Sequence, residues 1–276
     1  MSGLRLEDLT ADDILNNMQY YYDLFIEYRK LGFVELHPTR DQQEELVKLF
    51  ADAPESNSLF DVVHPHLEER LKEAPDDFLI GHWHTDNTVF EVCPNVTSMH
   101  MHYWKGTKGT GNTVLVDLQD LYDKCPKEYI NYLQALMVHH RSGMDNPDGT
   151  LHPGAHHPAL RSHPTTGKTC LWYTGPECDP TTGPDPLFDE YKDWMRTIKE
   201  TGQLYQPENQ FLWEWTEGDL LVWDNTCVVH AFYGGWEYGK RKFDKVEAGY
   251  SRPFFTRPWG AMMGRHIESE SVSHYG

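Results

Sequence analysis

Two histidines and one aspartate have the residue types and the order of a metal-binding triad. His84 and Asp86 are separated by one residue, and His230 ends the mostly apolar run 220–230. Two imidazoles and one carboxylate on one face of a metal leave three coordination positions open, which is what a non-haem Fe(II) oxygenase needs to hold a chelating co-substrate and O2 together. The sequence therefore predicts a facial-triad iron site at these three residues.

The segment 81–90 around the first two ligands predicts how they meet. Side chains alternate between the two faces of a strand, so His84 and Asp86 would project to the same side of a strand-like segment and share one ion. His82 would project to that side too and is a rival ligand. A zinc or manganese hydrolase would use the same triad with a metal-bound water. A non-catalytic sensor protein is the other alternative, although such a protein would usually have lost one of the three ligands.

Four segments that follow one another along the chain carry a resemblance to a known family. They are Trp83–Asp86, Gly109–Thr113, His163–Lys168, and the run from Gly218 through Trp223–Asn225 to His230. In this order and at these spacings they resemble the TauD/TfdA family of Fe(II)/2-oxoglutarate-dependent dioxygenases, over roughly residues 60 to 257. The resemblance implies a mainly β fold with flanking helices, in which the core is a double-stranded β-helix, or jelly roll.

The same resemblance implies the cofactor, the co-substrate and the reaction. His84, Asp86 and His230 would hold Fe(II), which 2-oxoglutarate chelates and at which O2 reacts. Hydroxylation of an unactivated C–H bond in a small, anionic or amino-acid-like molecule is the expected outcome, with release of succinate and CO2. Desaturation or cyclisation would follow from the same iron chemistry, and the sequence does not distinguish between them.

Two arginines are candidates to bind 2-oxoglutarate. Its far carboxylate needs a planar, two-pronged donor, which Arg supplies better than Lys. In the family that this chain resembles, that Arg lies about eleven residues beyond the distal His and works with a Thr; here these positions are Arg241 and Thr113. Arg252 is the reserve candidate, because the Gly-rich segment 233–239 leaves the register after His230 open.

Three further residues are candidate substrate contacts. Lys245 falls where taurine-type relatives place a second Arg, and a Lys attracts an anion as a point charge without the guanidinium fork, so sulfonate specificity is in doubt. His64 resembles another substrate-contacting position of those relatives. Trp83, beside the first ligand, would contact an apolar part of the substrate, since small-molecule sites are mostly apolar.

Composition restricts the partners of the chain. Its formal charge of −19 argues against binding to nucleic acid or to an anionic membrane, because affinity for phosphate comes largely from clustered Lys and Arg. No apolar run approaches the length of a membrane span and no secretion signal is visible, so a cytoplasmic location is expected. The five cysteines form no C-x-x-C pair and are expected to be reduced. A small molecule is the expected partner, and a homo-oligomer stays open.

The N-terminal part of the chain has the periodicity of helices. Apolar residues recur at three- and four-residue intervals over 7–30, which predicts one helix that Gly32 ends. Residues 33–36 resemble a short strand. Asp41 is the expected N-cap of a second helix, with Glu44 as its capping-box partner, and the N-terminal helices then span about 7–50.

From about residue 79 the pattern changes to short apolar or alternating runs, which predicts β strands in a core over about 79–257. A helical pattern interrupts these runs between residues 118 and 138, where Pro126 is expected to start a second helical segment. Residues 141–186 are rich in Pro, Gly, Asp and His, and are interpreted as a rim or lid. Residues 1–276 are expected to form a single domain.

Overall fold

The computed structural model describes the chain in several stretches. These are residues 3–52, 56–59, 83–106, 109–141, 150, 153–172, 178–181, 183–200, 210–232 and 240–256. Because 60–82 and 257–276 lie outside the described residues, a single domain over the whole chain stays a prediction.

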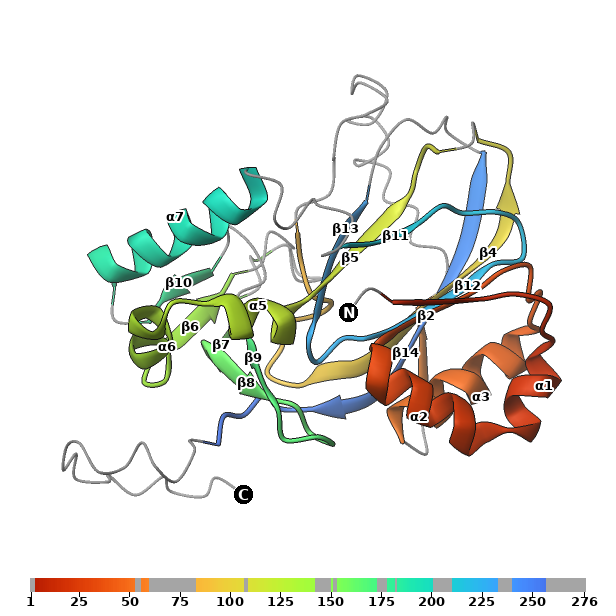
Figure 1. Ribbon diagram of the computed structural model, residues 1–276, viewed down its shortest axis with the longest axis horizontal. Coiled ribbons are helices and arrows are strands. Elements are labelled where there is room, and N and C mark those ends of the chain that lie inside the picture. Colours follow the sequence, from red (N-terminus) through yellow and green to blue (C-terminus); the bar gives the residue numbers. More distant parts are fainter. Residues whose placement is uncertain are drawn as a thin grey trace.

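One large sheet holds strands from both ends of the chain (Figure 1). In spatial order its strands are β1 (Leu4–Leu6), β2 (Lys30–Phe33), β12 (Leu220–Asp224), β4 (Cys93–Trp104), β14 (Arg241–Ser251) and β3 (Ser56–Leu59). A second sheet consists of β11 (Gln210–Trp213), β5 (Thr113–Asp117) and β13 (Val228–Phe232). All pairs within these two sheets are antiparallel except β1 with β2.

The two faces of the large sheet pack against different layers, as the period of two along a strand requires. In β12, Leu220 and Val222 belong to the core beneath the N-terminal helices, whereas Leu221 and Trp223 belong to the main core shared with β5, β11 and β13. The strand β14 divides in the same way, because its Val246 and Ala248 pack toward the helices. Lys245 and Glu247 therefore lie on the barrel side of the sheet.

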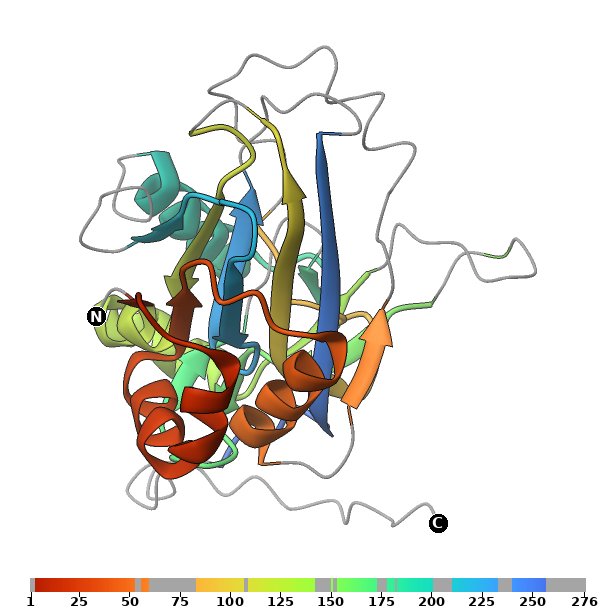
Figure 2. The same cartoon turned by 90° about the vertical axis from the view of Figure 1, so that its right-hand side faces the viewer.

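Three N-terminal helices cover the outer face of the large sheet (Figure 2). They are α1 (Ala11–Asn16), α2 (Met18–Tyr28) and α3 (Arg40–Ala51). The prediction of one helix over 7–30 was wrong, because the backbone breaks at Asn17 and α2 ends at Arg29, which has a φ of 60°. Gly32 does not end a helix; it lies in β2, where an added Cβ would come within 2.0 Å of the Trp213 ring. Close packing, and not helix termination, explains this glycine.

Two smaller expectations for this region also need correction. The strand that follows α2 is β2 (Lys30–Phe33) and not 33–36, because Val34 and Glu35 form a turn. The N-cap of α3 is Thr39 with Gln42 as its capping-box partner, two residues before the predicted pair Asp41 and Glu44.

The predicted strands and helices of the core are largely present. The segment after β5 contains α5 (Leu118–Lys124) and α6 (Lys127–Leu133), and Pro126 is the N-cap of α6 as expected. The helical pattern was extended too far, because Met137 and Val138 already belong to β6 (Met137–His140).

The segment interpreted as a rim contains four short strands. They are β7 (Ala155–Pro158), β8 (Leu160–Ser162), β9 (Thr169–Leu171) and β10 (Cys178–Pro180). β10, β6 and β7 form a small sheet, and β8 pairs with β9. A helix that the sequence analysis did not anticipate, α7 (Pro186–Glu200), lies next to this small sheet in Figure 1. A lid function of the segment stays a prediction.

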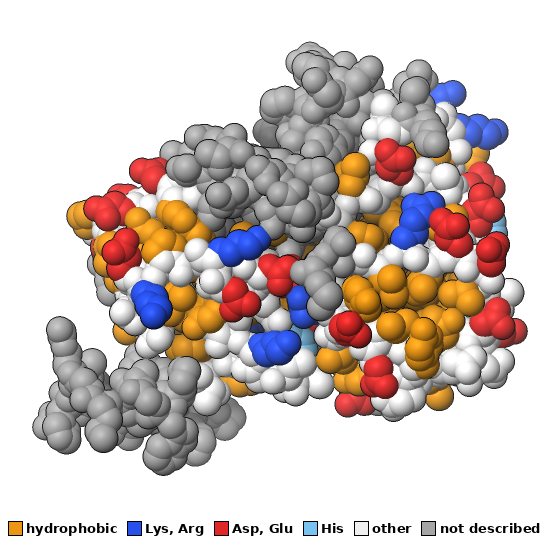
Figure 3. Space-filling model, viewed as in Figure 1, with side chains coloured by type: hydrophobic (Ala, Val, Ile, Leu, Met, Phe, Trp, Pro, Cys, Tyr) orange, Lys and Arg blue, Asp and Glu red, His pale blue; other side chains and the backbone are white. Residues whose placement is uncertain are grey.

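The described surface carries charges of both signs. On the face in Figure 3, Lys and Arg side chains are separated from one another by acidic or uncharged residues. Among the described residues, no helix has the length and apolar character needed to cross a membrane.

Candidate active site

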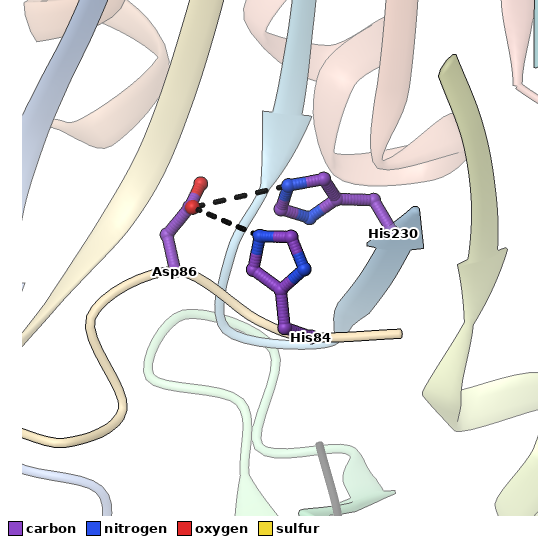
Figure 4. A group of neighbouring side chains, drawn as sticks. All are labelled: His84, Asp86 and His230. Atoms are coloured by element: carbon purple, nitrogen blue, oxygen red, sulfur yellow. Dashed lines mark ion pairs between the residues drawn. The ribbon is translucent and has the colours of Figure 1, made fainter. Parts of the chain in front are cut away.

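The structure brings the three predicted ligands together. One ligand atom from each of His84, Asp86 and His230 lies within 4.8 Å of the other two. Both histidine Nε2 atoms are 3.8 Å from Asp86 Oδ1, and Figure 4 shows the two imidazoles turned toward that carboxylate. The ring centroids of the two histidines are 4.2 Å apart.

Main-chain hydrogen bonds position the two histidines. His230 is the central residue of β13, and His84 forms an isolated bridge to it, in which each residue's amide donates to the carbonyl of the other at 2.9 and 2.8 Å. The hydroxyl of Thr85 donates to Val228 O at 3.0 Å, and so ties the intervening residue to the same strand. His84 is thereby held beside His230 on β13, although the two residues are far apart in the chain.

Asp86 lies in a turn and not in a strand. The strand-like interpretation of 81–90 was wrong beyond the bridge at His84, because residues 86–89 form a turn. Asn225 holds this turn from both sides: its Oδ1 accepts from the Asp86 amide at 2.9 Å, and its Nδ2 donates to Asp86 O at 3.0 Å. Asn225 belongs to one of the motif segments of the sequence, but its positioning role was not predicted.

A second hydrogen-bonded group supports the loop that carries Asn225. His163 Nε2 donates to Asp224 Oδ2 at 2.6 Å, while its Nδ1 accepts from the amides of Thr165 and Thr166. Asp224 Oδ1 also accepts from Thr226. Cys227 lies nearby, but both nitrogens of His163 and both oxygens of Asp224 already have partners. This group therefore stabilises the segment beside the triad, and its chemistry is not that of a second metal site.

The protonation states of Asp86 and His230 suit metal ligands. Asp86 and His230 are buried, whereas the His84 side chain is 43% exposed. Burial, and then the neighbouring His84, lower the pKa of His230 to about 3, so this imidazole is neutral at neutral pH. Burial alone would raise the pKa of Asp86, but Lys245 and the two histidines outweigh it and lower this pKa, so Asp86 is a carboxylate. Neutral imidazole and carboxylate are the forms that bind metal.

Two buried atoms of the triad are without hydrogen bonds in the part of the chain that the structure describes. They are Asp86 Oδ2 and His230 Nδ1. An unpaired buried carboxylate oxygen is costly unless a cation or a donor satisfies it. Together with the two Nε2 atoms that face Asp86, this fits a divalent cation held by nitrogen and oxygen ligands.

Lys245 adjoins the triad. Its Nζ is 2.6 Å from Asp86 Oδ1 and 3.1 Å from Glu247 Oε1, and its side chain is only 15% exposed. Burial would lower the pKa of this ammonium, but the two carboxylates outweigh burial and raise it. The candidate substrate contact is thus a buried cation shared between two acids.

Glu247 is a second site residue that sequence reasoning missed. Its Oε2 accepts from Asn87 Nδ2 at 2.8 Å and from the Tyr250 hydroxyl at 3.3 Å. Burial, and then the charge of Asp86, raise its pKa, although Lys245 acts in the opposite direction. The alternation of residues 241, 243, 245 and 247 along one strand was the signal that would have placed Glu247 beside Lys245.

The two arginines that are candidates to bind 2-oxoglutarate differ in exposure and in contacts. Arg241 is the first residue of β14, is half-buried, and lies with its guanidinium carbon 5.2 Å from the centre of the Phe243 ring. Arg252 is 69% exposed and pairs with Glu91 at 2.6 Å. Thr113 is buried on β5 opposite Phe232, two residues beyond His230, and its hydroxyl accepts from Trp215 Nε1 at 2.9 Å.

Trp83, His64 and His82 are the remaining candidate residues. Trp83 is buried in the main core, so its contact with substrate stays a prediction. His64 and His82 lie outside the described residues.

Comparison with known proteins identifies a family model and several relatives. The model described as "Taurine catabolism dioxygenase TauD, TfdA family" matches residues 5–241. "Alpha-ketoglutarate-dependent dioxygenase oryG" of Aspergillus oryzae is 26% identical over 194 residues, which are 62% of this chain and 55% of that protein. "(S)-phenoxypropionate/alpha-ketoglutarate-dioxygenase" of Sphingobium herbicidovorans is 24% identical over 253 residues, which cover 83% of this chain and 84% of that protein.

Solved structures share the fold. The crystal structure of AAD-2 in complex with Mn(II) and N-oxalylglycine superposes with a TM-score of 0.71 at 15% identity, covering 92% of this chain and 96% of that one. A taurine dioxygenase from Burkholderia xenovorans superposes with a TM-score of 0.63 at 19% identity, covering 87% and 83%. These likenesses, with the two mainly antiparallel sheets, confirm the double-stranded β-helix core.

Proposed function

Because this chain belongs to the taurine catabolism dioxygenase TauD, TfdA family, we propose that it is an Fe(II)- and 2-oxoglutarate-dependent dioxygenase that hydroxylates an unactivated C–H bond of a small molecule. The observation that carries the proposal is the convergence of His84, Asp86 and His230 within 4.8 Å, with a buried carboxylate and a buried neutral imidazole among them. This is the ligand set of a non-haem iron oxygenase.

The metal would be held by His84 Nε2, His230 Nε2 and the Asp86 carboxylate. When bound, Fe(II) together with 2-oxoglutarate and O2 supplies the oxidising power that breaks the C–H bond. The chain's own contribution is to hold the ligands in place before binding, through the bridge between the two histidines and the Asn225 contacts to Asp86. Such outer contacts orient the ligands and typically affect metal affinity about 10- to 100-fold.

An apolar side chain adjoins this site. The Trp223 ring lies 4.9 Å from the His230 ring, and both residues are buried. A hydrophobic neighbour limits the access of water to a metal site and lowers the local dielectric constant. The Trp223 ring would thereby strengthen the electrostatic interactions on which binding of the co-substrate depends.

Arg241 and Thr113 are the proposed contacts to 2-oxoglutarate. A half-buried guanidinium offers two parallel donors to a carboxylate. The Thr113 oxygen already accepts a hydrogen bond from Trp215, so its own O–H remains as a donor. Arg252 is the less favoured candidate because its side chain is 69% exposed.

The substrate is proposed to be a small anionic molecule. Two relatives are named for carboxylic acids, (S)-phenoxypropionate and 2,4-dichlorophenoxyacetate. Lys245 would attract such an anion from beside the triad, and His64 and Trp83 stay candidate contacts. Hydroxylation is proposed as the default outcome, with desaturation and cyclisation as the alternatives of the same iron chemistry.

An anaerobic titration tests the proposal. Fe(II) and then 2-oxoglutarate are added, and the weak visible charge-transfer band of the chelate is recorded, followed by measurement of succinate release with small acids. His84→Ala and Asp86→Ala should abolish both signals. His156→Ala is the matched control, because His156 is an exposed histidine on β7.

The outcome that contradicts the proposed function would be seen in the same measurements. Tight Zn(II) binding without a band, together with turnover that does not depend on 2-oxoglutarate, would overturn the proposal in favour of the hydrolase.

A further inference from the structure

Lys245 and a metal on the triad would share the carboxylate of Asp86. Lys245 Nζ is 2.6 Å from Asp86 Oδ1, and both histidine Nε2 atoms are 3.8 Å from that same oxygen. A divalent cation between the three ligands would therefore face the ammonium across a short distance. Like charges in a buried site repel strongly, since the local dielectric constant is low. Metal binding consequently requires a second acceptor for Lys245.

Glu247 is placed to be that acceptor. Its Oε1 is already 3.1 Å from Lys245 Nζ, and its side chain is only 2% exposed. The two residues lie two apart on β14, so their side chains share one face of the strand. A small movement of the flexible ammonium would transfer it from Asp86 to Glu247.

The carboxylate of Glu247 is itself held in place. Asn87 donates to its Oε2 at 2.8 Å, and the Tyr250 hydroxyl donates to the same oxygen at 3.3 Å. Asn87 directly follows the ligand Asp86, with a φ of 58° that belongs to the turn. The Glu247 carboxyl group is thus fixed in position next to the metal-binding turn, and its second oxygen faces the lysine.

We propose that Glu247 is a positioning residue for Lys245: it retains the lysine ammonium when a divalent metal binds Asp86. The inference rests on the proposed function, because it assumes that the triad binds a metal. It assigns to Glu247 a role in metal affinity that is exerted through Lys245.

Binding of Mn(II) alone, followed by the electron paramagnetic resonance signal of the free ion, tests this inference without any turnover. Glu247→Gln should weaken Mn(II) binding about 10- to 100-fold, as loss of an outer-shell partner typically does. Lys245→Met should tighten binding, because it removes the competing cation. A gain in affinity cannot come from misfolding, so this variant keeps the test valid if Glu247→Gln lowers stability.

The double variant separates action through the lysine from other roles. In the Lys245→Met background, the loss caused by Glu247→Gln should be about tenfold smaller than in the parent, a coupling typical of residues in contact. Glu91→Gln is the matched control, since it breaks an exposed pair with Arg252 and should leave Mn(II) affinity unchanged.

Each contrary result has one meaning. An equal loss in both backgrounds would overturn the inference, because Glu247 would then act through Asn87 or directly on the metal. Unchanged affinity in Glu247→Gln would overturn it as well. If the parent protein binds no Mn(II) and no Fe(II), the proposed function fails and the inference fails with it.

Discussion

Replacement of Arg241 by alanine should weaken 2-oxoglutarate binding strongly and leave the iron site intact. Arg241 is half-buried at the start of β14, the strand that also carries Lys245. Its proposed role is a two-pronged contact to the far carboxylate of the co-substrate. The iron ligands are on other segments, so the amount of bound Fe(II) should not change.

The expected change in 2-oxoglutarate affinity follows from how exposed the Arg241 and Arg252 side chains are. Hydrogen bonds to a charged group contribute about 1.5–3 kcal/mol each, and two of them at a half-buried site give about 3 kcal/mol. At 1.4 kcal/mol for each factor of ten, the dissociation constant of 2-oxoglutarate should rise by about 100-fold or slightly more. Arg252→Ala is the matched control: its pair with Glu91 is 69% and 68% exposed, and such pairs contribute about 0–1 kcal/mol to stability.

The assay is an anaerobic titration of the Fe(II) protein with 2-oxoglutarate, followed by the charge-transfer band. Arg241→Ala should shift the midpoint, and succinate formation at saturating 2-oxoglutarate should stay near the parent level. Arg241→Lys should give an intermediate midpoint, because it keeps the charge and loses the fork. A shift in Arg252→Ala with none in Arg241→Ala would refute the reasoning, since the register after His230 would then be wrong.

Three further predictions concern stability and specificity. Asp117→Asn should lower the free energy of unfolding by about 3 kcal/mol in urea denaturation, because it leaves the buried cations Arg29 and Lys30 without their shared carboxylate; an unchanged midpoint would contradict this. Burial lowers the pKa of His140 from 6.5 to about 3, so between these values the unfolded chain binds a proton that the native state does not. The free energy of unfolding should therefore fall as the pH falls below 6.5. In urea titrations at several pH values, His140→Gln should reduce the slope of the unfolding free energy against pH by about 1.4 kcal/mol per pH unit. Lys245→Ala should raise the KM of an anionic substrate and spare a neutral one, and equal effects on both would argue against the anion contact.

Local pattern determined much of the fold. Apolar periodicity placed α5 and α6 close to their observed positions and predicted a core of strands after residue 79, because the periods of helix and strand are local properties of the backbone. Apolar periodicity did not predict where the N-terminal helices end. Asn17 divides the predicted first helix, and Arg29 ends α2 with a positive φ. Gly32 was misinterpreted because the reason for its small size is the ring of Trp213, which is distant in the sequence.

The candidate site, like the fold, was partly predictable from local residue pattern and partly decided by long-range packing. Residue types and order predicted His84, Asp86 and His230, since the chemistry of iron restricts its ligands to few side chains. Only the tertiary structure decided how they meet, because the bridge to β13 and the Asn225 contacts join segments far apart in the chain. Glu247 belongs to this second class: no motif marks it, and its significance arises from the folding of β14 against the turn that carries Asp86. Sequence alone thus determined the chemistry that is available, whereas long-range packing decided which charges surround it.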